Sequence, residues 1–185
     1  MVLTISDGGL TNLQAVVALP RWPEGVSHVV RAGLRDEENA IRDDFTAYGY
    51  AFDNRDLETV MGFFAVDCVI TNPRGKVSGT AAIRDNYRLL FNYWVSARHF
   101  WTNVLVRFVT AGEAYVTAYH YAMLVKDGQT LAVAGTDLRR LAKIDGEWKI
   151  VERWITNDLN HVISLYTDAV EKSSEVEELM CEAVD

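Results

Sequence analysis

The most informative part of the sequence is residues 114–156, AYVTAYHYAMLVKDGQTLAVAGTDLRRLAKIDGEWKIVERWIT. β-branched and aromatic residues dominate this stretch, which is typical of strands. Asp127-Gly128 and Asp145-Gly146 divide it, and aspartate followed by glycine is a strong signal for the tight turn of a hairpin. The stretch therefore predicts three consecutive antiparallel strands, at residues 114–125, 130–144 and 148–156.

A fourth strand is predicted just before this stretch, at residues 100–109, so that the four strands form a meander. Strands of this length must twist and bend. A last helix is predicted after the meander by the spacing of Leu159, Val162, Ile163 and Tyr166.

The residues before the meander have a helical pattern. Ile41, Phe45, Tyr48 and Phe52 share one helix face, and this helix should end near Asp53. Two shorter helices are predicted at 56–64 and at 80–95 with Thr80 as a cap, and a short strand is predicted at 68–71. Helices gathered before a run of strands indicate an α+β fold.

The two ends of the chain differ from this central part. Residues 1–33 contain Gly8-Gly9, Pro20 and Pro23, and we expect them to form an N-terminal extension. Residues 171–185 carry six acids and one lysine, so we expect an acidic, solvated tail. The predicted domain is therefore residues 34–170.

The composition excludes several classes of protein. A chain of 185 residues with 49% hydrophobic residues favours one domain, and a net charge of −8 argues against a nucleic-acid partner. There is no apolar run of eighteen residues, which argues against a membrane span. Cys68 and Cys181 are too few for a disulfide framework, and the N-terminus lacks the basic region of a signal peptide, so we expect a cytoplasmic protein.

The aromatic content, 11% of the chain, fits either a packed core or an aromatic-walled pocket for a small, mostly apolar molecule. None of the four histidines has the spacing of a metal ligand, and the glycine-rich loops that bind phosphates or dinucleotides are absent. What remains is either no chemistry or chemistry without a cofactor or metal, for which a positioned histidine or carboxylate is sufficient.

Three residues stand out as candidates for this chemistry. Asp53 ends the first helix, and His99 opens the first long strand with Trp101 and Asn103 predicted on its face. Arg153 lies in the last strand of the meander. Each has a structural alternative: Asp53 as a solvated acid in a turn, His99 as a structural histidine, and Arg153 as a residue on a solvated sheet face.

Three segments carry a resemblance to a known family: Ile41 to Asp53, the strand Arg98-His99-Phe100, and the hairpin Asp145-Gly146-Glu147-Trp148-Lys149-Ile150. Together with the element order, they resemble the SnoaL-like branch of the nuclear-transport-factor-2-like superfamily. That superfamily includes scytalone dehydratase, lindane dehydrochlorinase, bile-acid dehydratase and ketosteroid isomerase. The resemblance covers about residues 34–170 and implies a cone-shaped α+β barrel of the cystatin-like type, with helices packed on a strongly curved antiparallel sheet.

The resemblance also implies roles for single residues. Asp53 matches the aspartate that these lyases place at the end of the first helix, and His99 matches their catalytic histidine. Arg153 falls where the dehydrochlorinase has an arginine that assists a leaving anion, and Tyr48 falls where bile-acid dehydratase uses a tyrosine. Phe52, Trp101, Tyr119 and Trp154 are then the candidates for the wall of the substrate pocket.

Departures from the family leave the substrate open. The second histidine of scytalone dehydratase has no counterpart near Val125-Lys126, and Tyr121 stands near the second acid of bile-acid dehydratase. The resemblance implies a cofactor-independent lyase of the dehydratase type, which uses His99 and Asp53 as a general-base dyad and acts on a small hydrophobic cyclic or hydroxylated molecule. One alternative is an isomerase or polyketide-type cyclase that uses the same dyad. Another is a non-catalytic module that binds a small molecule or takes part in an assembly.

Self-association is also expected. Leu131, Val133 or Trp148 on the outer face of the sheet would form an exposed apolar patch on a monomer. Related lyases form trimers and related isomerases form dimers, so the resemblance implies a homo-oligomer of one of these kinds.

Overall fold

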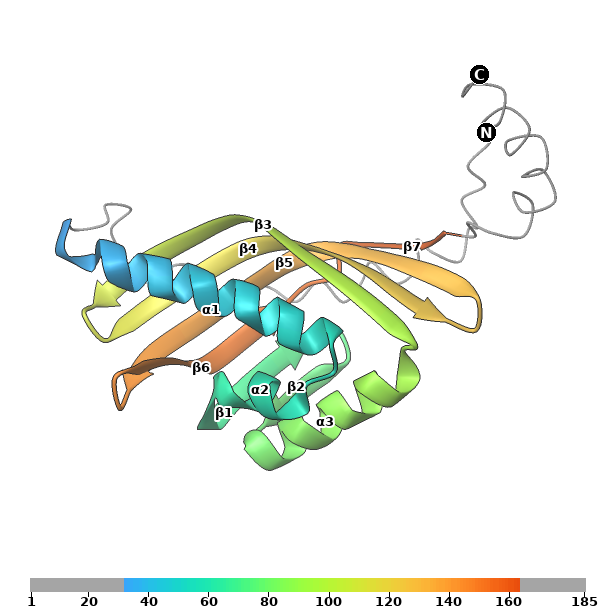
Figure 1. Cartoon of the computed structure of the whole chain (residues 1–185), viewed down its shortest axis with the longest axis horizontal. Helices are drawn as coiled ribbons and strands as arrows, with labels where there is room; N and C mark the ends of the chain where they lie inside the picture. Colours follow the sequence, from blue (N-terminus) through green and yellow to red (C-terminus); the bar gives the residue numbers. More distant parts are fainter. Residues whose placement is uncertain (1–31, 164–185) are drawn as a thin grey trace, which may run out of the picture.

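A strongly curved mixed sheet forms the body of the structure, a computed structural model that describes residues 32–163 (Figure 1). The strand order is β2-β1-β6-β5-β4-β3, and β7 pairs with β5 outside this path. The strands are β1 (Phe64–Asn72), β2 (Gly75–Ser78), β3 (Ser96–Thr110), β4 (Glu113–Lys126), β5 (Gln129–Ile144), β6 (Glu147–Ile155) and β7 (Leu159–Ile163).

The two hairpin turns predicted from the sequence are confirmed. Asp127 and Gly128 have φ angles of 51° and 75°, and Asp145 and Gly146 have 52° and 88°. Positive φ at both central residues is the type I′ geometry, whose twist matches that of the flanking strands. β4 therefore pairs with β5, and β5 with β6, in antiparallel register.

The helices cover the sheet as Figure 1 shows, with α1 (Arg35–Asp53) crossing one face of it. α2 (Leu57–Gly62) and α3 (Thr80–Tyr93) lie near β1 and β2. The predicted stripe of α1 is confirmed, because Ile41, Phe45 and Tyr48 are buried and Phe52 packs against the core. α3 begins at Thr80 as expected, but the capping residue is Gly79, with a φ of 81°, rather than Thr80.

The helix predicted around residues 159–166 is wrong, because residues 159–163 form strand β7. β6 pairs with β5 only from Asp137 to Ile144, which leaves the first half of β5 without a partner on that side. β7 pairs with this half, from Thr130 to Ala134. Satisfying these backbone groups outweighs the local helical spacing. Tyr166 lies outside the described residues.

The sheet is larger than the predicted meander. β1 extends the short strand expected at 68–71, forms a hairpin with β2 and pairs with β6 in parallel. The predicted second helix is correspondingly shorter, since α2 ends at Gly62.

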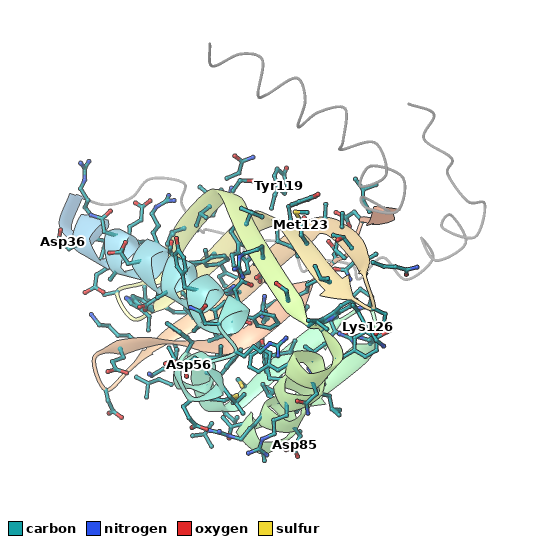
Figure 2. The ribbon with its side chains drawn as sticks, turned by 45° about the vertical axis from the view of Figure 1, so that its right-hand side comes forward. Asp36, Asp56, Asp85, Tyr119, Met123 and Lys126 are labelled. Carbon is teal, nitrogen blue, oxygen red and sulfur yellow. The ribbon has the colours of Figure 1, made fainter. Side chains whose placement is uncertain are left out.

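The expected apolar patch has different members from those predicted. Val133 and Trp148 are buried, whereas Phe100, Tyr119 and Tyr121 on the outer side of β3 and β4 are exposed. Figure 2 shows Tyr119 on this outer side. Self-association stays a prediction.

No helix within residues 32–163 combines the length and the apolar character needed to cross a membrane. Most of the expected N-terminal extension, up to residue 31, and the whole acidic tail with Cys181 lie outside the described residues.

Candidate active site

Asp53 and His99 form a hydrogen-bonded pair, as the sequence led us to expect. Asp53 Oδ1 lies 2.6 Å from His99 Nδ1, and the backbone N–H of His99 donates to Asp53 Oδ2 at 2.9 Å. The side chains are 12% and 15% exposed, respectively. A carboxylate at the C-terminal end of a helix opposes the helix dipole, and these two hydrogen bonds offset that cost.

Arg55 fixes the two elements that carry this pair. It follows α1, and its guanidinium donates to the backbone carbonyls of Trp94 and Val95, just before β3 begins. This contact holds the start of β3 against the end of α1. His99 is therefore brought to Asp53, although 46 positions separate the two residues in the chain.

The hydrogen bond determines which nitrogen of His99 is available for chemistry. An ionised carboxylate only accepts hydrogen bonds, so Nδ1 carries a hydrogen and Nε2 is the nitrogen that can take a proton. Trp101 stacks on the imidazole at 5.4 Å between ring centroids, and Phe52 meets it edge-on at 4.6 Å. These rings hold the imidazole in one orientation.

His99 lines a cavity of about 160 Å³ between the sheet and the helices. An apolar cavity of about 150 Å³ can hold benzene, so the enclosed space fits one six-membered ring. Rings form much of the wall, and polar side chains are placed among them. The lining includes Tyr48, Phe52, Asn86, Tyr87, Trp94, His99, Trp101, His120, Arg153 and Asn157.

A buried charge cluster lies next to this cavity. Asp137 is fully buried and accepts hydrogen bonds from Arg139 Nη2 at 2.8 Å, Arg153 Nη2 at 2.6 Å and Trp101 Nε1 at 3.2 Å. Burial alone would raise the pKa of Asp137, but the two arginine charges dominate and hold it well below its usual range. The cluster therefore keeps two positive charges and one negative charge.

Two tyrosine hydroxyls connect this cluster to the cavity. Arg153 Nη1 donates to Tyr48 at 2.6 Å and to Tyr87 at 3.0 Å, and the two hydroxyl oxygens lie 2.6 Å apart. Burial raises the pKa of Tyr87 well above its ordinary value, so this hydroxyl stays protonated. Burial works against the charge of Arg153 too, but Asp137 and the tyrosines raise the pKa of that guanidinium.

A second histidine, His120 on β4, also lines the cavity. It pairs across the sheet with Trp101, and it is 9% exposed. Burial lowers its pKa, with the charges of Arg153 and His99 adding to the effect and Asp137 opposing it. His120 is therefore neutral at pH 7. A neutral, buried histidine fits a structural role in the cavity wall.

The structure brings most of the predicted site residues together. Asp53, His99, Tyr48 and Arg153 are joined through direct hydrogen bonds or a shared cavity, and Arg153 is buried rather than on a solvated face. Phe52 and Trp101 line the cavity, as expected.

Tyr119 and Trp154 do not line the cavity, and this corrects the expectation for them. Tyr119 is 59% exposed because it alternates with His120, which points inward. Trp154 alternates in the same way with Arg153 and Ile155, which both face the cavity. Asn103 also departs from the predicted face, because a β-bulge between Thr102 and Leu105 breaks the alternation of β3.

Three residues of the site were not recognised from the sequence: Tyr87, Asp137 and His120. Tyr87 lies within the helix predicted at residues 80–95, where nothing in the local sequence marks it as a site residue. Asp137 did carry a signal, since it is a charged residue within the otherwise apolar run LAVAGTDL. The face of His120 depends on strand register, which the sequence alone does not specify.

Among the residues that the structure describes, no three His, Cys, Asp or Glu side chains lie close enough together to hold a metal ion. Cys68 is buried, and burial raises the pKa of its thiol to about 11, which agrees with a packing role.

A curved sheet covered by helices, with a cavity between the two, defines the class as α+β proteins of the cone-shaped type. Within this class, the chain belongs to the SnoaL-like domain family, whose sequence profile matches residues 34–154. The resemblance inferred from the sequence and the predicted fold class are thereby confirmed. No curated protein sequence matches the chain.

Solved structures agree with this assignment. One is a provisionally named scytalone dehydratase from Novosphingobium aromaticivorans, with a TM-score of 0.65 and 21% identity over 71% of this chain and 91% of that one. A provisionally named aromatic ring hydroxylase from the same organism has a TM-score of 0.65 and 25% identity, over 69% and 94%. A hexachlorocyclohexane dehydrochlorinase from Novosphingobium barchaimii has a TM-score of 0.64 and 18% identity, over 71% and 92%.

Proposed function

We propose that this protein is a cofactor-independent lyase that eliminates water from a small hydrophobic, cyclic or hydroxylated molecule. The observation that carries the proposal is the hydrogen-bonded pair of Asp53 and His99 beside a cavity of about 160 Å³. A carboxylate that orients an imidazole is a common arrangement for a general base. The size of the cavity favours a substrate with a single ring in the enclosed part.

In the proposed reaction, His99 Nε2 removes a proton from a carbon atom of the substrate. The electrons of that C–H bond form a carbon–carbon double bond, and the hydroxyl group on the neighbouring carbon departs with the electrons of its C–O bond. The departing group takes the proton from His99 and leaves as water, so that the base is regenerated and no oxidant or reductant is consumed. Asp53 stabilises the imidazolium that exists between these two transfers.

General base catalysis of this kind contributes about 10²- to 10⁴-fold to a rate. This is sufficient for removing an activated proton, but more is needed when charge develops on the departing group. The buried positive charge of Arg153, reaching the cavity through Tyr48, supplies favourable electrostatics for that charge.

The comparisons support elimination as the reaction type. A dehydratase and a dehydrochlorinase by name are among the similar structures, and both names denote removal of a small molecule from the substrate. The third similar structure is named as a hydroxylase, so elimination is not the only reaction named among structures with this fold. At these identities the substrates of the relatives do not transfer to this chain.

The proposal is tested by screening single-ring hydroxylated compounds for loss of water, followed by mass spectrometry and ultraviolet absorbance. His99→Ala should lower kcat by at least about 10²-fold, while the thermal melting curve stays nearly unchanged. Asp53→Asn should also lower kcat, whereas Asp85→Asn, which changes a surface aspartate on α3, should not. A His99→Ala enzyme that retains the wild-type rate would refute the proposal.

We further propose that the protein is a cytoplasmic homo-oligomer without a nucleic-acid or membrane partner. The net charge of −8 and the exposed Phe100, Tyr119 and Tyr121 support this view. Light scattering coupled to size-exclusion chromatography measures the oligomeric state directly, and a monomer at micromolar concentration would contradict it.

A further inference from the structure

The hydroxyl groups of Tyr48 and Tyr87 hold one hydrogen that no described residue accepts. Their oxygen atoms lie 2.6 Å apart, so one hydroxyl donates to the other. Arg153 cannot accept the remaining hydrogen, because a guanidinium only donates. Within residues 32–163 neither hydroxyl has another hydrogen-bond partner. One O–H hydrogen of the pair is therefore available to a molecule in the cavity that both tyrosines line.

Arg153 is itself almost fully engaged. Nε and Nη2 donate to Asp137 at 3.1 and 2.6 Å, and Nη1 donates to both tyrosines. Its charge therefore reaches the cavity mainly through the hydroxyl groups, which it polarises. This differs from the sequence-based expectation that Arg153 meets a departing group directly.

The charge of the surroundings favours an acceptor that becomes negative. The buried cluster contains Arg139 and Arg153 but only one carboxylate, Asp137, so it keeps an excess of one positive charge. In an interior of low dielectric constant, such an excess stabilises a negative charge placed at the adjacent hydroxyl pair.

The hydroxyl pair and the proposed base line the same cavity, and both have Phe52 as a neighbour. The ring of Phe52 is 4.6 Å from that of His99 and 5.6 Å from that of Tyr87, measured between centroids. His99, Tyr48 and Tyr87 therefore all border the space that a bound ring would occupy.

We propose that Tyr87 is a further catalytic residue, and that Tyr48 and Tyr87 together donate one hydrogen bond to a substrate oxygen that gains negative charge when the proton is removed. This inference rests on the proposed lyase function for its catalytic meaning, but the hydrogen bond is testable without turnover. The pair works as one donor, because either hydroxyl can carry the available hydrogen while the other donates to it.

This sharing predicts non-additive effects. In Tyr48→Phe or Tyr87→Phe the remaining hydroxyl keeps its own hydrogen, which is no longer needed by its former partner. Each single variant therefore retains a donor, whereas the Tyr48→Phe/Tyr87→Phe variant has none. Losing a hydrogen bond to a charged group lowers affinity by about 10- to 100-fold.

The test compares two ring compounds of the same shape, para-nitrophenol and para-nitrotoluene, of which only the first can carry a negative oxygen. Visible absorbance reports the ionisation of bound para-nitrophenol, and calorimetry reports both affinities. The wild-type protein should bind the phenolate more tightly than para-nitrotoluene. Each single variant should lose less than about 10-fold of this preference, and the double variant about 10- to 100-fold.

Controls separate this inference from folding defects and from the lyase proposal. Tyr93→Phe, which changes an exposed tyrosine on α3, should bind both compounds as the wild type does, and para-nitrotoluene should bind all folded variants equally. His99→Ala should keep the phenolate preference even though it loses turnover. A phenolate preference that is lost in His99→Ala but kept in Tyr48→Phe/Tyr87→Phe would overturn this inference and leave the lyase proposal standing.

Three results would refute the donor pair. The first is a wild-type protein that binds the phenolate no more tightly than para-nitrotoluene, and this measurement does not depend on any variant folding. The second is a folded double variant with the wild-type preference. The third is a single variant that loses as much as the double variant, since one hydroxyl would then act alone.

Discussion

Asp137→Asn should destabilise the protein strongly, because it leaves two buried arginines without a counter-charge. Asp137 is fully buried and accepts hydrogen bonds from Arg139, Arg153 and Trp101. Asparagine has nearly the same shape but no charge, and its amide group offers donors where the two guanidinium groups need acceptors.

The magnitude follows from the burial of the pair. Removing one partner of a buried ion pair costs about 3–5 kcal/mol, because the other charge stays buried and uncompensated. In a chain of this size each kcal/mol lowers Tm by about 2–4 °C, so we expect Tm to fall by about 6–20 °C. Arg139→Met should cost less than Asp137→Asn, because it leaves Asp137 paired with Arg153 and a net charge of zero.

Urea unfolding followed by tryptophan fluorescence measures these differences in the free energy of unfolding. Glu152→Gln is a matched control, because Glu152 binds Arg140 in a partly exposed pair and its loss should cost less than about 1 kcal/mol. The reasoning would be refuted by an Asp137→Asn protein within about 1 kcal/mol of the wild type, or by an Arg139→Met protein less stable than Asp137→Asn.

Two further predictions concern residues around the cavity. Gly135→Ala should lower the free energy of unfolding by at least about 1–3 kcal/mol, because a Cβ there would overlap the backbone carbonyl of Thr156. Gly62→Ala is the control and should be neutral, because a Cβ there meets no other atom. Equal urea midpoints for the two variants would contradict this prediction. The pKa of His120 is lower in the folded protein than in the unfolded chain, so the unfolded chain binds a proton at His120 more readily. The contribution of neutral His120 to stability is therefore fully present above about pH 6.5 and is lost as the pH falls towards the folded-state pKa. The free energy of unfolding should therefore fall less between pH 7 and pH 5 in His120→Gln than in the wild type. Urea titrations at the two pH values measure this fall, and the same fall in both proteins would refute the prediction.

Much of the fold could be predicted because its signals are local. The positive φ angles at Asp127 and Asp145 are properties of the Asp-Gly turns themselves. The buried stripe of α1 follows from a spacing that any amphipathic helix would show. β7 could not be predicted, because its strand conformation depends on an unpaired half of β5 that exists only after the sheet has formed.

The candidate site divides in the same way. Asp53 and His99 were identified as candidates from their residue types and positions, and the resemblance to the SnoaL-like family paired them. Tyr119 and Trp154 were assigned to the cavity in error, since a strand presents alternate residues to opposite faces and one step of register exchanges them.

The sequence by itself determined the order of the elements from α1 to β6 except for β2, the two tight hairpins, and the chemical types available for a base and its orienting acid. Only the tertiary structure decided that Asp137 stands between Arg139 and Arg153 and that Tyr87 meets Tyr48 across 39 positions of chain. The physical reason is that turns and helix faces depend on neighbouring residues. A buried charge or hydroxyl acquires its partners, its pKa and its role only when distant elements exclude water around it.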